Sequence, residues 1–227
     1  MHVAIIMDGN RRWAAARGLA PAEGYRRGVI TLRDTVAAAA DCGLSDLTVY
    51  GFSTENWKRS RAEVGMLMHL CGAFARSERA ELQRLGVRVG VIGEMDLFPL
   101  HARAALRDLV RATAANRRLR LHLALNYSGR DEILRAVRSI AREVQGGRLQ
   151  TAAIDDAALR AGMYAPDVAD PDLLIRTGGD FRLSNFLLYQ VAYTELLTLP
   201  MMWPDFTSDH FAAAVREFGL RRRRFGT

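Results

Sequence analysis

The sequence lacks several residue patterns that identify particular classes of protein. Its two cysteines, Cys42 and Cys71, have neither CxxC spacing nor a paired histidine motif, which excludes a disulfide framework and a cysteine zinc site. Lys58 is the only lysine, and it does not follow a GxxxxGK(S/T) loop, which excludes a Walker phosphate site. The longest apolar runs, such as 196–203, are interrupted by Pro200 and fall far short of the roughly 20 residues of a membrane span.

The composition is that of an ordinary globular protein. Of the 227 residues, 49% are hydrophobic and 25% are charged, and the charges are spread along the whole chain. No repeat or low-complexity linker divides it, so we expect a single domain over residues 1–227. The N-terminus opens directly into HVAIIM without the pattern of a signal peptide, and we therefore expect a cytoplasmic protein.

The positive charge of the chain is almost all arginine. The formal net charge is +7, although only one residue is lysine. A strongly basic protein favours an anionic partner, which could be nucleic acid, an acidic membrane surface or a polyanionic small molecule. Arginine, with its planar fork of donors, is especially suited to phosphate groups.

Short β-rich segments alternate with longer amphipathic segments along the chain. This alternation predicts an α/β fold with a central, mostly parallel six-stranded sheet flanked by helices. The predicted strands are His2–Met7, Leu47–Phe52, Val87–Ile92, Leu119–Asn126, Leu173–Arg176 and Tyr193–Thr198. The predicted helices are Glu23–Cys42, Arg61–Leu85, Pro99–Ala115, Arg130–Gln145 and Ser208–Phe218. The helix that begins at Arg61 carries a wide apolar stripe, which fits a plain core or the wall of an apolar tunnel.

Three polar segments follow predicted strands, where open parallel sheets bind their ligands. The first is DGNRRW, in which Gly9 permits close backbone approach and Arg11 and Arg12 can receive an anion. Asp8 would repel a phosphate unless a divalent cation stood between them, so it is our candidate Mg²⁺ ligand. Taken alone, this segment equally fits an ordinary Asp-Gly turn with solvated arginines.

The other two polar segments supply further anion-binding groups. STENWKR follows the second strand, where Arg59 can reach a phosphate and Asn56 can orient or relay a proton. RTGGDFRLSN follows the fifth strand and places two arginines and two hydroxyls around a diglycine. Glu195, in a β-like apolar run, needs a partner or an ion, and we expect it to share Mg²⁺ with Asp8. Each segment by itself also fits a capped or solvated turn.

Five ordered motifs carry a family resemblance over nearly the entire chain. The motifs are HVAIIMDGNRRWA, FSTENWKRS, LNYSGRDEI, PDLLIRTGGDFRLSNFLL, and AYTEL followed by WPDF. Together they resemble the cis-prenyltransferases, also called undecaprenyl diphosphate synthase-like enzymes. The ending Arg224-Phe225-Gly226 is similar to the RxG ending of that family. The DDxxD signature of trans-prenyltransferases is missing, because Asp155-Asp156 is followed by Ala-Ala-Leu.

The resemblance implies a homodimeric, Mg²⁺-dependent enzyme with an apolar tunnel. In this chemistry an allylic diphosphate loses pyrophosphate as the double bond of isopentenyl diphosphate attacks its C1, which forms a Z double bond. The implied partners are therefore these two diphosphates and no nucleic acid, with a peripheral membrane contact for release of the lipid product. Mg²⁺ and arginine would stabilise the charge that develops on the leaving pyrophosphate.

Roles are carried over by position in the motifs. Asp8 would bind Mg²⁺ and assist departure of the diphosphate, Glu195 would share the metal, and Asn56 would relay a proton. The allylic diphosphate would be held by Gly9, Asn10, Arg11, Arg12 and Arg59. The isopentenyl diphosphate would be held by Arg176, Arg182 and Ser184. Further substrate-binding positions are Trp13, Tyr25, Ser53, Thr54 and Trp57.

The sequence departs from the family pattern near the allylic site. Pro21 stands where an arginine is common, and Tyr25 stands where a polar histidine commonly follows Gly24. Arg11, Arg26 or Arg27 would have to replace the missing arginine. Product length would depend on the closed end of the tunnel, where Gly51 leaves room and Leu125 or Leu67 removes it.

Other functions stay open at this point. The departures leave room for irregular head-to-middle coupling of two dimethylallyl units, as in divergent relatives. A non-catalytic subunit of a heteromeric prenyltransferase is a second alternative, although the catalytic positions are retained. A third alternative is a nucleic-acid binder that uses the basic run 221–224. The same run also fits a solvated tail or a tail that faces a dimer partner.

Overall fold

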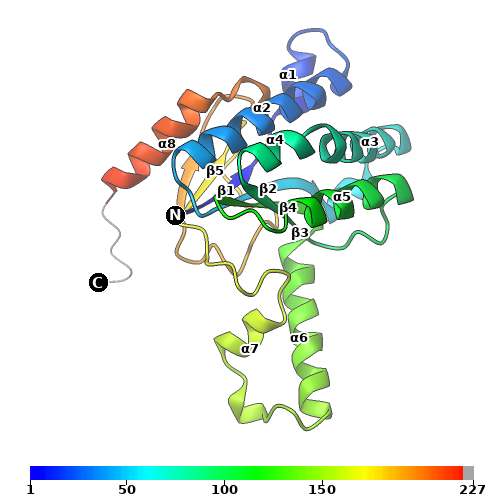
Figure 1. The fold of residues 1–227 in the computed structure, drawn as a ribbon, viewed down its shortest axis with the longest axis vertical. Helices are drawn as coiled ribbons and strands as arrows, with labels where there is room; N and C mark the ends of the chain where they lie inside the picture. The colour runs from blue at the N-terminus through cyan, green and yellow to red at the C-terminus, as the bar shows by residue number, and fades with distance from the viewer. Residues whose placement is uncertain (222–227) are drawn as a thin grey trace.

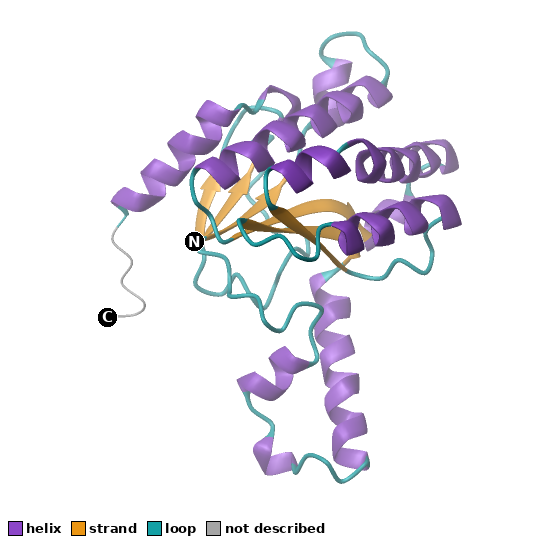
Figure 2. Ribbon diagram, viewed as in Figure 1, coloured by secondary structure: helices purple, strands orange, loops and turns teal. Residues whose placement is uncertain are grey.

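The architecture is a single six-stranded parallel sheet with helices around it (Figures 1 and 2). It comes from a computed structural model that describes residues 1–221, so the arginine run beyond 221 and the RxG ending lie outside the described residues. The strands are β1 (His2–Ile6), β2 (Asp46–Ser53), β3 (Val87–Ile92), β4 (Leu119–Tyr127), β5 (Leu173–Arg176) and β6 (Glu195–Thr198). Their order is β3-β4-β2-β1-β5-β6, and every neighbouring pair is parallel, which confirms the predicted fold class.

Eight α-helices accompany the sheet within residues 1–221. They are α1 (Asn10–Ala15), α2 (Pro21–Asp41), α3 (Arg61–Ser77), α4 (Arg79–Arg84), α5 (Leu100–Ala112), α6 (Gly129–Gln145), α7 (Asp156–Ala161) and α8 (Ser208–Leu220). Three short 3₁₀ turns are η1 (Thr54–Lys58), η2 (Thr151–Ala153) and η3 (Trp203–Asp205). Several helices start at a side-chain cap: Ser60 accepts from the Glu63 amide, and Ser128 from the Asp131 amide. No helix of this described part is both long and apolar enough to cross a membrane.

The two faces of the sheet are covered differently. One face, with Val3 and Ile5 of β1, packs against α2, α3, α5 and α8 in the main core. The other face, with Ala4 and Ile6, is covered by a smaller cluster that contains Phe186 and Leu187 from the loop after β5. This alternation follows from the opposite direction of successive side chains in a strand. Figure 1 shows α6 and α7 extending away from the rest of the molecule as an arm.

The boundaries differ from the predicted ones in places that have a physical cause. The predicted helix 61–85 is two helices, α3 and α4, which meet at Glu78. Glu78 is buried, and its carboxylate accepts two bonds of 2.7 Å from the Arg33 guanidinium on α2. This ion pair fixes Glu78 at the junction of α3 and α4. The apolar periodicity continues on both sides of Glu78, so the sequence pattern alone does not reveal the junction. β6 begins at Glu195 rather than Tyr193, and α2 begins at Pro21, the helix position that proline favours.

The carboxyl ends of all six strands lie at one edge of the sheet, because all the strands are parallel. The chain order reverses at β1, which lies between β2 and β5. Open α/β sheets bind ligands beside such a reversal, outside the carboxyl ends of the strands. The segments after β1, β2 and β5 are the three polar segments of the sequence analysis, and the fold brings them together here.

Helix α1 packs against α2 over two glycines of α2. A β-carbon on Gly24 would lie 2.0 Å from the carbonyl oxygen of Asn10, and one on Gly28 would lie 2.3 Å from its side-chain oxygen. Both distances are far inside van der Waals contact, and the first atom belongs to the backbone. The close approach of α1, which carries Arg11 and Arg12, therefore depends on these two glycines.

We predict that Gly24→Ala displaces α1 and lowers the free energy of unfolding by about 3 kcal/mol, at the upper end of the usual cost of overpacking. Gly65→Ala is the matched control, since Gly65 lies within α3 and nothing lies within 4 Å of its added carbon. That variant should be neutral or more stable by about 1 kcal/mol. Urea unfolding of both variants measures the difference, and equal stability of the two would contradict the close packing.

Candidate active site

A cavity of about 1110 Å³ opens at the carboxyl edge of the sheet. Its walls combine charged and polar groups with an apolar interior. The polar wall contains Asp8, Gly9, Asn10, Arg11, Arg12, Tyr25, Ser53, Asn56, Arg59, Arg176, Arg182 and Ser184. The apolar wall contains Val29, Leu32, Val49, Phe52, Leu67, Leu70, Phe74, Leu106, Leu123 and Leu125. One cavity therefore meets all three polar segments and the apolar stripe of α3.

The loop after β1 is held in place by the loop after β5. Gly9 has a φ of 108°, in the region that favours glycine, and a β-carbon there would lie 2.7 Å from the Met202 sulfur. The Asp8 amide donates to the Thr177 hydroxyl at 3.0 Å, and that hydroxyl donates back to the Asp8 carbonyl at 2.8 Å. Thr177 is fully buried. These two hydrogen bonds fix the position of the Asp8 backbone, and with it the position of the Asp8 carboxylate at the cavity wall.

The Asp8 carboxylate is balanced by two arginines. Its oxygens lie 2.7 Å from the Arg176 guanidinium and 3.4 Å from that of Arg12. Burial raises the pKa of Asp8, but the hydrogen bond and charge of Arg176, with the charge of Arg12, outweigh it and leave the pKa below its ordinary value. Asp8 is therefore ionised at neutral pH, as a metal ligand has to be.

Two groups of arginines lie at the cavity: the first contains Arg11 and Arg59, and the second contains Arg176 and Arg182. Arg176 is the centre of this second anion-binding group, whose name states its predicted role. Its side chain is only 5% exposed, and its guanidinium donates to the Ser184 hydroxyl at 2.9 Å and to the Arg182 carbonyl. Its Nε atom is buried and has no hydrogen-bond partner. Asp180, which the sequence analysis did not assign, lies 2.7 Å from Arg182 and 3.4 Å from Arg12. The cluster therefore concentrates three guanidinium groups around two carboxylates.

The first anion-binding group contains a carboxylate that sequence reasoning missed. Glu63 accepts from Arg59 at 2.9 Å and from the Tyr25 hydroxyl at 2.8 Å, and it lies 3.8 Å from Arg11. Burial and the hydrogen bond to Glu63 raise the pKa of Tyr25 to about 12, so the phenol is a donor at neutral pH. The spacing of Arg59 and Glu63, four residues apart at a helix start, was the available signal.

The three arginines considered as replacements for the one absent at Pro21 have different surroundings. Arg11 lines the cavity. Arg26 is exposed and pairs with Glu23, and the Arg27 Nε donates to the Pro204 carbonyl. Of these three, only Arg11 is therefore at the cavity wall.

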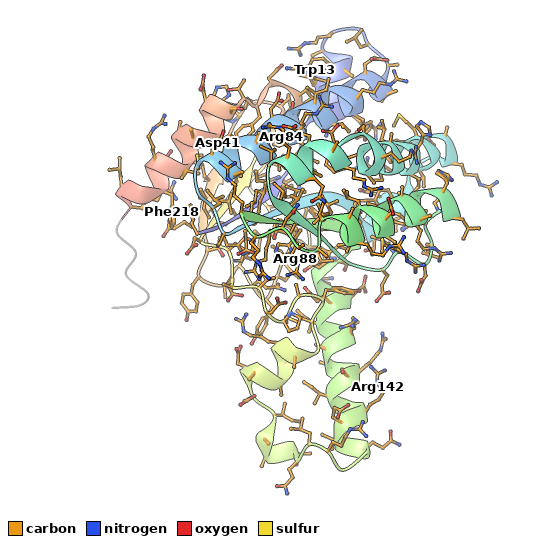
Figure 3. The ribbon with its side chains drawn as sticks, in the orientation of Figure 1. Trp13, Asp41, Arg84, Arg88, Arg142 and Phe218 are labelled. Carbon is orange, nitrogen blue, oxygen red and sulfur yellow. The ribbon has the colours of Figure 1, made fainter. Side chains whose placement is uncertain are left out.

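Three predicted substrate contacts are not supported by their positions. Trp13, Thr54 and Trp57 are not part of the cavity wall. The Trp13 indole donates to Asp205 at 2.7 Å, and Figure 3 labels Trp13 on the outer helix α1. The Trp57 indole donates to Asn126 at 2.7 Å and packs edge-on against Phe52. Both rings satisfy their N–H groups elsewhere, which a linear motif does not reveal.

Asn56 and Ser53 do lie at the cavity wall. The Asn56 side-chain oxygen accepts from the Ser53 amide at 3.1 Å, as part of a capping box at the start of η1. The alternative prediction for this segment, an ordinary capped turn, is therefore confirmed. It leaves the Asn56 side chain facing the cavity, where its predicted role in proton transfer stays a prediction.

Glu195 is not brought to Asp8. It lies at the amino end of β6, opposite Leu173 in the first register pair, whereas Asp8 follows the carboxyl end of β1. Its carboxylate instead pairs with Arg221 at 3.1 Å. An ion shared by these two carboxylates of one chain is excluded, because parallel register puts them at opposite edges of the sheet.

The surroundings of Asp8 still fit a Mg²⁺ ion that is shared with a substrate. Within residues 1–221 no group of three or more His, Cys, Asp or Glu side chains could form a complete metal site. Mg²⁺ commonly takes only one or two protein carboxylates and completes its shell with substrate phosphates and water. One ionised carboxylate beside two arginine guanidinium groups, which suit phosphate, fits that arrangement.

Comparisons with known proteins agree with this geometry. Residues 6–226 match the prenyltransferase family model for undecaprenyl diphosphate synthase. An isoprenyl transferase from Agrobacterium fabrum is 50% identical over 99% of this chain and 91% of its own length. Isoprenyl transferase 2 from Bradyrhizobium diazoefficiens is also 50% identical, over 99% of this chain and 89% of its own.

Two solved structures share the fold. The lavandulyl diphosphate synthase from Lavandula x intermedia, in complex with dimethylallyl diphosphate, has a TM-score of 0.96 at 35% identity. A probable undecaprenyl diphosphate synthase from Campylobacter jejuni has a TM-score of 0.82 at 29% identity. Each alignment covers 100% of this chain and 98% of the other.

Proposed function

The chain belongs to the undecaprenyl diphosphate synthase family of prenyltransferases, and from this premise we propose the reaction that it catalyses. It condenses an allylic diphosphate with isopentenyl diphosphate in a Mg²⁺-dependent reaction and forms a Z-configured isoprenyl diphosphate. The observation that supports this proposal is the joint placement of two arginine groups at one cavity with an apolar interior. Each arginine group takes one diphosphate, and the apolar wall takes the hydrocarbon.

The reaction requires one bond to form and another to break. The double bond of isopentenyl diphosphate attacks C1 of the allylic substrate, the C1–oxygen bond breaks, and pyrophosphate leaves. A proton is then lost from the condensation product to the departed pyrophosphate as the new double bond forms, and Asn56 is the candidate to orient or relay that proton. Mg²⁺, when bound, neutralises charge on the leaving pyrophosphate. Asp8 would hold that ion, and Arg11 and Arg59 would hold the allylic diphosphate. Arg12, which lies beside Asp8 and Asp180, would contact the same diphosphate from the side of the second arginine group.

A second candidate is irregular head-to-middle coupling of two dimethylallyl units. The high TM-score to a lavandulyl diphosphate synthase that binds dimethylallyl diphosphate favours keeping it. A non-catalytic partner subunit is disfavoured, because Asp8, Asn56 and the arginines of both groups line one cavity. Product analysis separates these possibilities.

A homodimer is part of the proposal. Leu134 and Val137 on α6 are 48% and 49% exposed, and α6 belongs to the arm that extends from the molecule, with Arg142 in its outer half (Figures 1 and 3). A second copy of the chain would cover these apolar side chains. A cytoplasmic location and a peripheral membrane contact for product release also stay proposals, and light scattering of the purified protein tests the dimer.

The decisive experiment incubates the purified chain with labelled isopentenyl diphosphate and allylic primers of C5 to C20. We expect Z-configured products, no product after chelation with EDTA, and recovery of activity with added Mg²⁺. A parallel reaction with dimethylallyl diphosphate alone detects head-to-middle coupling. Failure to form any isoprenoid product with all primers and with Mg²⁺ present would refute the proposed enzyme activity.

A further inference from the structure

The loop after Arg182 has an unusual backbone. Ser184, Asn185 and Leu187 all have positive φ values, of 50°, 65° and 46°. This region is costly for residues other than glycine, although asparagine tolerates it better than most. Such conformations persist only where the surroundings hold them, and they gather at binding sites. The loop also carries Ser184, one of the groups expected to bind isopentenyl diphosphate.

Asn185 holds this loop to two other elements. Its side-chain nitrogen donates to Ser128 at 2.8 Å and to Glu55 of η1 at 2.9 Å. Its side-chain oxygen accepts from the Arg130 amide at 3.0 Å, and its carbonyl accepts from the Gly129 amide at 2.8 Å. Asn185 thus connects the loop to the start of α6 and to the turn after β2.

Tyr50 supports the same loop from the sheet. Its hydroxyl lies 3.3 Å from the Ser184 carbonyl and 3.3 Å from the Tyr127 carbonyl. Its ring stacks on Phe186, with ring centres 4.5 Å apart, and Phe186 is fully buried. Tyr50 of β2 therefore contacts both residues that flank Asn185, while Asn185 itself is held by Ser128 and Glu55.

The backbone conformation of this loop determines the contacts of Arg176 in the second anion-binding group. With Ser184 in this conformation, its hydroxyl lies 2.9 Å from the Arg176 guanidinium, which also contacts the Arg182 carbonyl. We propose that Asn185, supported by Tyr50, is a positioning residue that shapes the isopentenyl diphosphate subsite through Ser184 and Arg176. This inference rests on the proposed function. Tyr50 and Asn185 also line the cavity, and the role assigned to them is to hold the loop that carries Ser184.

The test uses variants that separate the side-chain bonds from the backbone preference. Asn185→Gly keeps the freedom to adopt a positive φ but loses every side-chain bond, and Tyr50→Phe loses only the hydroxyl. We expect Asn185→Gly, which loses three side-chain hydrogen bonds, to raise the KM for isopentenyl diphosphate about 10-fold, and Tyr50→Phe about 3-fold, the scale of ordinary partly exposed hydrogen bonds. The KM for the allylic primer should change by less than about 2-fold in both variants, since Arg59 and Arg11 are untouched.

Asn126→Gly is the matched control. Asn126 also has a positive φ, of 48°, but its side chain bonds to Trp57 and to the Glu94 carbonyl rather than to the loop. It should lower the melting temperature without a selective change in the KM for isopentenyl diphosphate. Equal rises of both KM values in Asn185→Gly, or no rise, would overturn the positioning role.

Equilibrium binding keeps this inference separate from the proposed reaction. Isothermal titration of isopentenyl diphosphate with Mg²⁺ into the full chain should show weaker binding to Asn185→Gly than to the unchanged protein. If the unchanged protein binds this ligand but forms no product, the proposed reaction fails and the positioning role is still tested by affinity. Equal affinity of the two proteins would refute the positioning role whatever the activity.

Discussion

Asp8→Asn should lower kcat by about a thousandfold while the fold stays intact, which is the scale of losing a preorganised electrostatic group. The substitution preserves the size of the side chain and removes the charge that Mg²⁺ requires. The carboxylate is already ionised, because Arg176 and Arg12 hold its pKa below the ordinary value, so the loss should be present throughout the neutral pH range. Steady-state kinetics with saturating Mg²⁺ and both diphosphates measure it.

The control for this experiment is Asp108→Asn. Asp108 is also paired with an arginine, Arg79, at 2.7 Å, but it lies on α5 outside the cavity wall. It should keep kcat within about 2-fold, as expected for an exposed pair that contributes little. Near-normal turnover in Asp8→Asn, with unchanged circular dichroism, would reject the metal-binding role.

Arg182→Ala and Arg59→Ala should have opposite substrate selectivity. Arg182 belongs to the second anion-binding group and Arg59 to the first, and each side chain lines the cavity. Loss of charged hydrogen bonds to a diphosphate costs about 1.5–3 kcal/mol, which corresponds to a KM rise of roughly 10- to 150-fold. Arg182→Ala should raise the KM for isopentenyl diphosphate, and Arg59→Ala should raise the KM for the primer.

The exposed Arg84 provides the control for these two variants. It pairs with Glu81 at 2.6 Å and is not part of the cavity wall. Arg84→Ala should leave both KM values unchanged, which would show that the general positive charge of the protein does not account for binding. Equal effects of Arg182→Ala on the two substrates would remove the assignment of two separate subsites.

The sequence predicted the main elements well where local patterns are strong. Apolar strand segments separated by amphipathic segments are typical of a parallel α/β sheet, and this part of the prediction is confirmed. The break at Glu78 was missed because the partner of this buried carboxylate, Arg33, is distant in the sequence, while the helical pattern continues on both sides of Glu78. Helix α7 was also missed, since six residues carry little periodicity.

The predicted site also contains residues whose position follows from the sequence and residues whose position depends on distant partners. Asp8, Arg12, Arg176 and Arg182 line one cavity because segments directly after parallel strands must share one edge of the sheet, while their binding roles stay predictions. Trp13 and Trp57 were included on motif position, but the direction of an indole depends on partners such as Asp205 and Asn126. Asn185 stood inside a quoted motif without a role, because its partners come from two other parts of the chain.

The sequence by itself determined the fold class, the arginine-rich character and the three polar loops, because strand periodicity, turn residues and charge are local properties. Only the tertiary structure decided which side chains meet. It placed Glu63 between Arg59 and Tyr25, and it put Glu195 at the far edge from Asp8. The physical reason is that hydrogen bonds and ion pairs act over a few ångströms, and only the folded chain brings distant residues that close.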